Sequence, residues 1–202
     1  LAAADALDLG GLLLALGLGR RNQGRTWPNP AVGCVIVRDG QVVGRGWTDI
    51  GGRPHAEPRA LQQAGERAKG ATAYVTLEPC AHHGQTPPCA NALIEAGIAR
   101  VVVAMTDPDP RVDGGGLAML RDAGVDVTTG VCAARARADH MGFLLRTTDG
   151  RPMVTLKLAM SADGRIATAN GDSQWITGPA ARRRVHLMRA RHDAVLVGSG
   201  TA

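Results

Sequence analysis

Two stretches of the sequence carry the main evidence for its fold and function: His55-Ala56-Glu57 and Thr76-Leu77-Glu78-Pro79-Cys80-Ala81-His82-His83-Gly84-Gln85-Thr86-Pro87-Pro88-Cys89. A catalytic zinc site takes about three ligands from the protein and leaves the remaining tetrahedral position for water. His55, Cys80 and Cys89 supply ligands of this number and kind. We therefore predict one zinc ion per chain, bound by these three residues.

Glu57 follows the first of these ligands by two residues. Zinc lowers the pKa of a bound water to about 7. A neighbouring carboxylate can then take the proton of the water, pass it to a ring nitrogen and protonate the departing ammonia. His-x-Glu followed by Pro-Cys and a second Cys is the signature of zinc-dependent deaminases. We predict that Glu57 is the catalytic acid–base group, in the first turn of a helix over 56–68.

Other interpretations of these residues remain open. Eight residues separate Cys80 from Cys89, where deaminases usually have two, and two cysteines alone can be buried thiols. A structural zinc protein would close the site with a fourth ligand, such as His82 or His83, and would tolerate replacement of Glu57. A deaminase of nucleic acid would need aromatic platforms for the bases. Only 2% of the residues are aromatic, although the net charge is +5.

The rest of the first 145 residues alternates apolar β-branched runs with helical patterns. We expect strands at 32–37, 42–47, 71–77, 100–105 and 125–128, and helices at 1–23, 56–68, 90–96, 117–122 and 133–143. Asp39-Gly40 predicts a hairpin turn between the first two strands. Four glycines weaken the first helix by up to about 1 kcal/mol each relative to Ala, so we expect its extreme N-terminus to be poorly formed. The alternation indicates a mixed sheet with helices on both faces, with the site at the C-terminal ends of strands.

Several motifs together resemble one narrower family. They are Trp27-Pro28-Asn29-Pro30-Ala31-Val32-Gly33-Cys34, Pro54-His55-Ala56-Glu57, Leu77-Glu78-Pro79-Cys80, His82-His83-Gly84 and Thr86-Pro87-Pro88-Cys89. Over roughly residues 25–143 the chain resembles the bifunctional riboflavin-biosynthesis deaminase/reductases. The resemblance implies a cytidine-deaminase-like three-layer sandwich. It also implies zinc-dependent hydrolytic deamination of 2,5-diamino-6-ribosylamino-4(3H)-pyrimidinone 5′-phosphate.

The resemblance also implies substrate contacts. It assigns Asn29 to a hydrogen bond with the pyrimidine and His82 to the substrate. A turn-forming role fits Asn29 equally well, and the alternative for His82 is a solvated loop histidine. At Gln85 the family usually has Lys or Arg, which would help to hold the substrate. Glutamine keeps the hydrogen bonding and lacks the charge.

Residues 152–202 resemble the start of the reductase of that family, a dihydrofolate-reductase-like domain that uses NADPH. We expect strands at 152–158 and 193–198 and a helix at 179–191. Two strands and one helix are too few to enclose a dinucleotide. The resemblance therefore implies that further strands lie beyond residue 202, and that this chain by itself deaminates but does not reduce.

The reductase resemblance assigns five individual residues. Ala159, Trp175 and Thr201 match contacts with the nicotinamide cofactor, and Ser173 and Arg189 match contacts with the substrate. A packing residue is the alternative for Trp175, and a solvated helix face is the alternative for Arg189.

These assignments give a domain plan and a cellular setting. We predict a zinc-dependent pyrimidine deaminase domain at 1–145, a linker at 146–151 and the N-terminal part of a reductase domain at 152–202. Two of four cysteines committed to a metal indicate a reducing compartment, and no secretory signal is recognised, so we expect a cytoplasmic protein. No apolar run reaches the length of a membrane span. We expect a phosphorylated pyrimidine as partner, no nucleic acid and no membrane, and leave homo-oligomerisation open.

Overall fold

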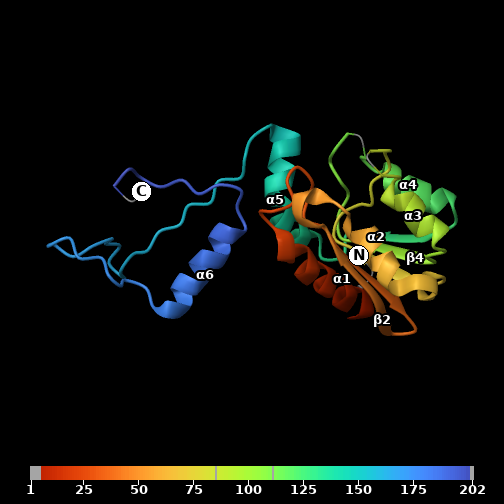
Figure 1. Cartoon of the computed structure of the whole chain (residues 1–202), viewed down its shortest axis with the longest axis horizontal. Coiled ribbons are helices and arrows are strands. Elements are labelled where there is room, and N and C mark those ends of the chain that lie inside the picture. Colours follow the sequence, from red (N-terminus) through yellow and green to blue (C-terminus); the bar gives the residue numbers. More distant parts are fainter. Residues whose placement is uncertain (1–5, 85, 111, 201–202) are drawn as a thin grey trace. The chain divides into compact units, whose positions relative to one another are not determined.

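The computed structural model of the chain describes residues 6–84, 86–110 and 112–200 (Figure 1). It divides into two compact units, Leu1–Pro152 and Met153–Ala202. Among the described residues, none of the helices combines the length and apolarity that a membrane span requires.

The first unit is built on a five-stranded sheet with the strand order β2-β1-β3-β4-β5. The strands are β1 (Gly33–Arg38), β2 (Gln41–Trp47), β3 (Thr72–Val75), β4 (Arg100–Val103) and β5 (Asp126–Thr129). β1 pairs antiparallel with both β2 and β3, whereas β3, β4 and β5 run parallel. The prediction of a mixed sheet is confirmed. Asp39 and Gly40 join β1 to β2 with positive φ angles of 51° and 72°, as a type I′ hairpin turn requires.

Helices cover both faces of this sheet (Figure 1). The helices of this unit are α1 (Ala6–Gly19), α2 (Ala56–Ala64), α3 (Cys89–Glu95), α4 (Gly115–Asp122) and α5 (Ala133–Asp149), with short 3₁₀ turns at Arg20–Asn22, Ile50–Gly52 and Gly65–Ala68. Along β3, Ala73 and Val75 belong to the core under α2, α3 and α4, and Tyr74 belongs to the core under α1 and α5. Because successive side chains of a strand point to opposite faces, this alternation gives the predicted three-layer sandwich.

The predicted N-terminal helix is confirmed over Ala6–Gly19, and its glycines make close packing possible. Leu12, Ala15 and Leu16 of α1 are buried against the sheet. A Cβ atom added to Gly11 would lie 2.6 Å from ring atoms of Tyr74, so only a glycine allows this contact. The packing offsets the low helix propensity of the glycines. The expectation for residues 1–5 lies outside the described part of the chain.

Helix α2 lies directly on strand β2, again through glycines. A Cβ atom on Gly44 would lie 2.2 Å from the carbonyl oxygen of Ala60, and one on Gly46 would lie 1.9 Å from that of Ala56. Both distances are far below van der Waals contact. The backbone of the helix therefore rests on the backbone of the strand, and this contact fixes the height of the N-terminus of α2 above the sheet.

Helix α5 is longer than the sequence indicated. It was expected to end at residue 143, and it continues to Asp149, where Gly150 caps it with a φ of 66°. Residues 146–149, the first four of the expected linker, are thus helical. Leu144 is buried in this extension, so packing against the unit carries the helix beyond the expected end.

The second unit contains helix α6 (Pro179–Ala190), close to the predicted range of 179–191. The expected strands at 152–158 and 193–198 are wrong, because the described residues of both stretches contain no strand. Their apolar side chains face solvent, with Val154, Leu156 and Leu196 exposed by 83%, 79% and 99%. A β-strand needs hydrogen-bonding neighbours and a covered face, and the described part of this unit supplies neither.

Candidate active site

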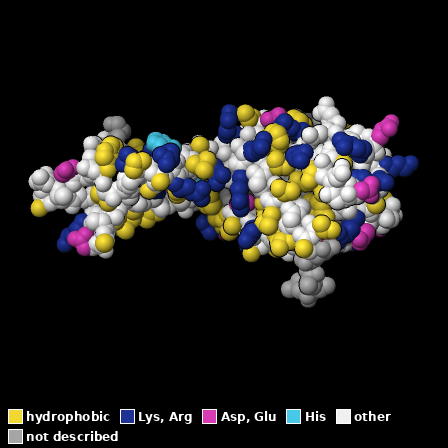
Figure 2. Space-filling model, turned by 90° about the horizontal axis from the view of Figure 1, so that it is seen from below, with side chains coloured by type: hydrophobic (Ala, Val, Ile, Leu, Met, Phe, Trp, Pro, Cys, Tyr) yellow, Lys and Arg dark blue, Asp and Glu magenta, His cyan; other side chains and the backbone are white. Residues whose placement is uncertain are grey.

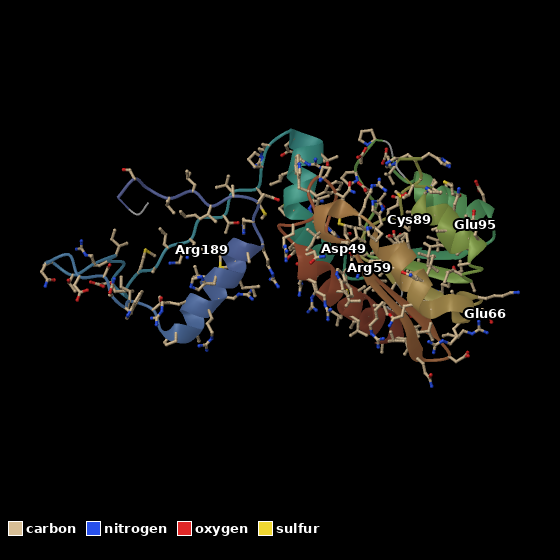
Figure 3. The ribbon with its side chains drawn as sticks, in the orientation of Figure 1. Asp49, Arg59, Glu66, Cys89, Glu95 and Arg189 are labelled. Atoms are coloured by element: carbon tan, nitrogen blue, oxygen red, sulfur yellow. The ribbon has the colours of Figure 1, made fainter. Side chains whose placement is uncertain are left out.

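The three predicted zinc ligands lie at the ends of three different elements. His55 is the residue before the first turn of α2, and Cys80 follows β3. Cys89 opens α3 (Figure 3). The parallel strands β3 and β4 end on this side of the sheet, which is where open α/β sheets place their sites. The chain therefore gathers residues that are up to 34 positions apart in the sequence.

Their donor atoms form one compact group. The Nδ1 atom of His55 lies 3.4 Å from Sγ of Cys89 and 3.8 Å from Sγ of Cys80. All three donor atoms lie within 4.8 Å of one another. The backbone N–H of Cys89, at the start of α3, donates to Sγ of Cys80 over 3.3 Å. The long spacer between the cysteines thus closes into a loop that returns Cys89 to Cys80.

The three donor groups shift one another's pKa values. A hydrogen bond from Cys89 lowers the pKa of the Cys80 thiol to about 4. The same hydrogen bond and burial raise the pKa of the Cys89 thiol. Hydrogen bonding to Cys80 raises the pKa of His55. One imidazole nitrogen and two sulfurs suit a zinc ion, because zinc favours nitrogen and sulfur ligands. Zinc binding displaces the protons that these groups carry.

Glu57 lies beside this group without belonging to it. Its side chain is only 3% exposed, in the first turn of α2. Burial raises the pKa of this carboxyl, and the nearby charge of His55 and a hydrogen bond with Cys89 act in the opposite direction. Cys34 of β1 lies in the core, and its thiol pKa is raised by burial and then by the charge of Glu57. The structure thus gives Cys34 the buried place that the sequence suggested.

A second buried carboxylate, Glu78, holds the neighbouring loop in place, a role that the side-chain pattern of the sequence does not reveal. Its Oε1 accepts from the backbone N–H of Gly116 at 2.9 Å and from that of Leu117 at 3.2 Å. Its Oε2 accepts from the N–H of Asp107 and of Gly114, both at 3.2 Å. These bonds tie the segment two residues before Cys80 to the N-terminus of α4.

The rim of the site carries polar side chains. The amide nitrogen of Asn29 donates to the carbonyl oxygen of Gly52 at 2.8 Å and lies 3.4 Å from Nε2 of His55. The amide thus supports a turn, and Asn29 also lies next to a predicted ligand. His82 is partly buried, and its Nδ1 has no hydrogen-bond partner among the described residues. His83 is exposed.

Two further features of the rim bear on charge. Nη1 of Arg53 donates a hydrogen bond to Oγ1 of Thr86 at 2.7 Å. The sequence pattern had not indicated Arg53 as a residue of the site. Gln85, where the family usually has a basic residue, lies outside the described residues.

The donor group contains His55, Cys80 and Cys89 and no fourth protein ligand among the described residues. That composition matches the open site expected of a catalyst.

The predicted residues of the second unit do not form a site by themselves. Among its described residues, no hydrogen bond or ring contact joins Ala159, Ser173, Trp175 or Arg189 to one another. Ser173 and Arg189 are exposed. Trp175 is 68% exposed and is covered on one face by the guanidinium of Arg182, 4.3 Å from the ring centroid. Thr201 lies outside the described residues.

Two known protein families match separate parts of the chain. Residues 12–105 match the family described as the cytidine and deoxycytidylate deaminase zinc-binding region. Residues 152–202 match the RibD C-terminal domain. Fold and donor group therefore define a zinc-binding deaminase-type domain, and the cytidine-deaminase-like fold expected from the sequence is confirmed.

The relatives narrow this class to one family. The riboflavin biosynthesis protein RibD of Escherichia coli is 57% identical over 187 residues, which are 93% of this chain and 51% of that protein. The structure of a diaminohydroxyphosphoribosylaminopyrimidine deaminase/5-amino-6-(5-phosphoribosylamino)uracil reductase from Thermotoga maritima matches with a TM-score of 0.89 and 42% identity, over 96% of this chain and 56% of that chain. A structure of Acinetobacter baumannii RibD matches with a TM-score of 0.80 and 52% identity, over 92% and 52% of the two chains.

The chain belongs to the RibD family of riboflavin biosynthesis proteins. It spans about half the length of the curated relatives that it matches.

Proposed function

We propose that this chain is a zinc-dependent aminohydrolase of riboflavin biosynthesis. Its substrate would be 2,5-diamino-6-ribosylamino-4(3H)-pyrimidinone 5′-phosphate, from which it removes an amino group as ammonia. The observation that carries the proposal is the group of three zinc-type donor atoms within 4.8 Å of one another, with a buried carboxylate beside it. Membership of the RibD family supports the choice of substrate.

In this proposal His55, Cys80 and Cys89 hold one zinc ion. When bound, the ion would supply Lewis acidity, which brings the pKa of a water molecule to about 7. The water oxygen attacks the ring carbon that bears the amino group, the carbon–nitrogen bond breaks, and the carbon is left as a carbonyl. Water and the aminopyrimidine are thereby converted to the pyrimidinedione and ammonia.

Glu57 moves the protons of this reaction. Its carboxylate takes a proton from the attacking water and delivers it to the ring, and a later transfer protonates the departing amine. Burial raises its pKa, and a raised pKa suits a carboxylate that must both accept and hold a proton near neutral pH. We assign Asn29 and His82 to substrate binding. The unpartnered Nδ1 of His82 supports this assignment.

We propose a deaminase domain over 1–145, a linker over 146–151, of which residues 146–149 continue helix α5, and the N-terminal part of an NADPH-dependent reductase domain over 152–202. The match of residues 152–202 to the RibD C-terminal domain supports the last part. Ala159, Trp175 and Thr201 are assigned to the cofactor, and Ser173 and Arg189 to the substrate of the reduction.

We propose that the protein works in the cytoplasm and binds neither nucleic acid nor a membrane. Cys34, Cys80, Cys89 and Cys132 are all free thiols, which suits a reducing compartment. On the face shown in Figure 2, basic side chains are interspersed with apolar and neutral ones, whereas a nucleic-acid groove concentrates them along a track. Association into homo-oligomers remains compatible with this function.

The test is ammonia release from the pyrimidine phosphate by the zinc-loaded protein. We expect release that stops when a chelator removes the metal and returns with added zinc. Ammonia from cytosine in single-stranded DNA, with none from the pyrimidine phosphate, would favour a nucleic-acid deaminase. A protein that holds one zinc ion per chain and releases ammonia from neither substrate would be a structural zinc protein.

A further inference from the structure

Arg53 differs from Arg59 and Arg100, two other partly buried arginines, in its ion pairing. Arg59 pairs with Asp49 at 2.7 Å, and these two side chains meet beside α2 (Figure 3). Arg100 likewise pairs with Asp8 at 2.7 Å. Arg53 is partly buried, yet within the described ranges no carboxylate forms an ion pair with it. A positive charge held next to a site without a neutralising partner is available to an anionic ligand.

The position of Arg53 relates it to the proposed zinc group. It precedes His55 by two residues, and its guanidinium lies along the loop that returns to Cys89. Nη1 donates to Oγ1 of Thr86 at 2.7 Å, and a Cβ atom built on Gly84 would lie 3.0 Å from Nη2. The guanidinium thus bridges the entry to α2 and the loop that precedes α3, at the rim of the site.

The hydrogen-bonding capacity of Arg53 is largely unused. A guanidinium carries five N–H donors in a planar fork, and the bond to Thr86 is the one hydrogen bond from this side chain among the described residues. The fork matches two oxygens of a phosphate, which a lysine ammonium meets only as a point charge. The bond to Thr86 also holds the side chain in place, so less side-chain freedom is lost when an anion binds.

We propose that Arg53 binds the phosphate group of the substrate and makes this deaminase site selective for the phosphorylated pyrimidine. The inference rests on the proposed function and adds a specificity-determining residue to it. It also explains how the chain can lack a basic residue at Gln85. Both neighbours of that position, Gly84 and Thr86, lie against the Arg53 side chain, which supplies a positive charge to the same loop.

The experiment compares Arg53→Gln, Arg53→Lys and the control Arg67→Gln. Arg67 is an exposed arginine in the 3₁₀ turn beyond the other end of α2, so its removal changes the net charge by the same amount. Each variant is assayed with the pyrimidine phosphate and with its dephosphorylated nucleoside. Zinc content is measured in parallel.

For Arg53→Gln we expect the KM for the phosphate to rise about ten- to hundredfold, the effect of losing charge-assisted hydrogen bonds. The KM for the nucleoside, kcat and the zinc content should stay close to those of the wild type. Arg53→Lys should recover part of the affinity, and Arg67→Gln should behave as the wild type. An equal rise in KM for both substrates, an unchanged KM for the phosphate or a loss of zinc would each overturn the proposal.

Direct binding separates this inference from the proposed function. Ribose 5-phosphate is titrated into the zinc-loaded wild type and into Arg53→Gln, and the heat of binding is recorded. We expect binding by the wild type that weakens at least tenfold in the variant. If the wild type binds ribose 5-phosphate through Arg53 but releases no ammonia, the proposed function fails and the anion site stands. If ammonia is released and binding is the same in both proteins, Arg53 is not the anion site.

Discussion

Replacement of Glu78 by Gln should destabilise the first unit, although the two side chains have nearly the same size. The carboxylate accepts two backbone N–H groups on each oxygen, at 2.9–3.2 Å, and is 4% exposed. Glutamine keeps one oxygen and turns an NH₂ group toward the other pair of donors. Two buried N–H groups are then left without acceptors, whichever way the amide is turned.

The cost follows from the number of bonds lost. An unsatisfied buried donor costs about 1–3 kcal/mol, so two of them cost about 2–6 kcal/mol. Whole domains are stable by roughly 5–15 kcal/mol, so the loss should be a large part of the total. With a denaturant slope of about 2 kcal/mol per M, the midpoint of urea unfolding should fall by about 1–3 M.

Urea unfolding of the zinc-loaded protein, followed by circular dichroism, measures this change. The matched control is Glu95→Gln, which alters an exposed glutamate near the end of α3 and should leave the midpoint unchanged. Because Glu78 holds the segment before Cys80, the variant should also lose zinc at a lower chelator concentration than the control does. Equal midpoints for the two variants would refute this account of Glu78.

Five further substitutions test the site and the core. Cys89→Ser should reduce zinc content well below one per chain by elemental analysis, whereas Cys34→Ser should leave it unchanged. Glu57→Gln should keep zinc and slow ammonia release by about 10²–10⁴-fold, the usual contribution of proton transfer. Gln85→Lys should leave the zinc content unchanged and should not lower the KM for the pyrimidine phosphate, because Arg53 already supplies a positive charge to this loop. His140, whose pKa burial lowers to about 4, should make the protein acid-sensitive. In the unfolded chain its imidazole binds a proton near pH 6.5, so stability should fall by about 3 kcal/mol between pH 6.5 and pH 4. His140→Gln should reduce this loss in urea titrations at pH 7 and pH 5.

Each of these expectations has an opposing result. Full zinc occupancy in Cys89→Ser would remove that residue from the ligands, and wild-type turnover in Glu57→Gln would remove that carboxylate from the mechanism. A KM for the pyrimidine phosphate that falls in Gln85→Lys would show that Arg53 does not provide the needed charge. Equal acid sensitivity of His140→Gln and the wild type would mean that His140 is not the group responsible.

The sequence predicted the elements whose patterns are local. β1, β2 and the Asp39–Gly40 turn follow from an alternating apolar run and a dipeptide that tolerates positive φ. The close grouping of His55, Cys80 and Cys89 was predicted, because three candidate ligands of one metal ion have to converge. These features are determined by residues close in the chain, or by chemistry that requires a short distance.

What the sequence missed depends on partners that are distant in the chain. The backbone donors to Glu78 lie 29 to 39 positions away, and backbone N–H groups leave no trace in a pattern of side chains. The stretches at 152–158 and 193–198 have the composition of strands, but strand formation depends on a neighbour that composition does not supply. Helix α5 extends to Asp149 because of tertiary contacts that its helical periodicity does not reveal.

The seating of α2 on β2 has a consequence for the engineering of this protein. Because helix and strand touch through main-chain atoms at Gly44 and Gly46, even an alanine at either position would have to lift the helix that carries His55 and Glu57. Mutant libraries aimed at new pyrimidine substrates should therefore recover almost no variants at these two glycines. The exposed positions of the same helix, such as Pro58, should accept many residues. Tolerance to mutation in this part of the chain depends on the short distance between α2 and β2. In a deep mutational scan, the positions that accept no substitution should be those where the strand contacts the backbone of α2.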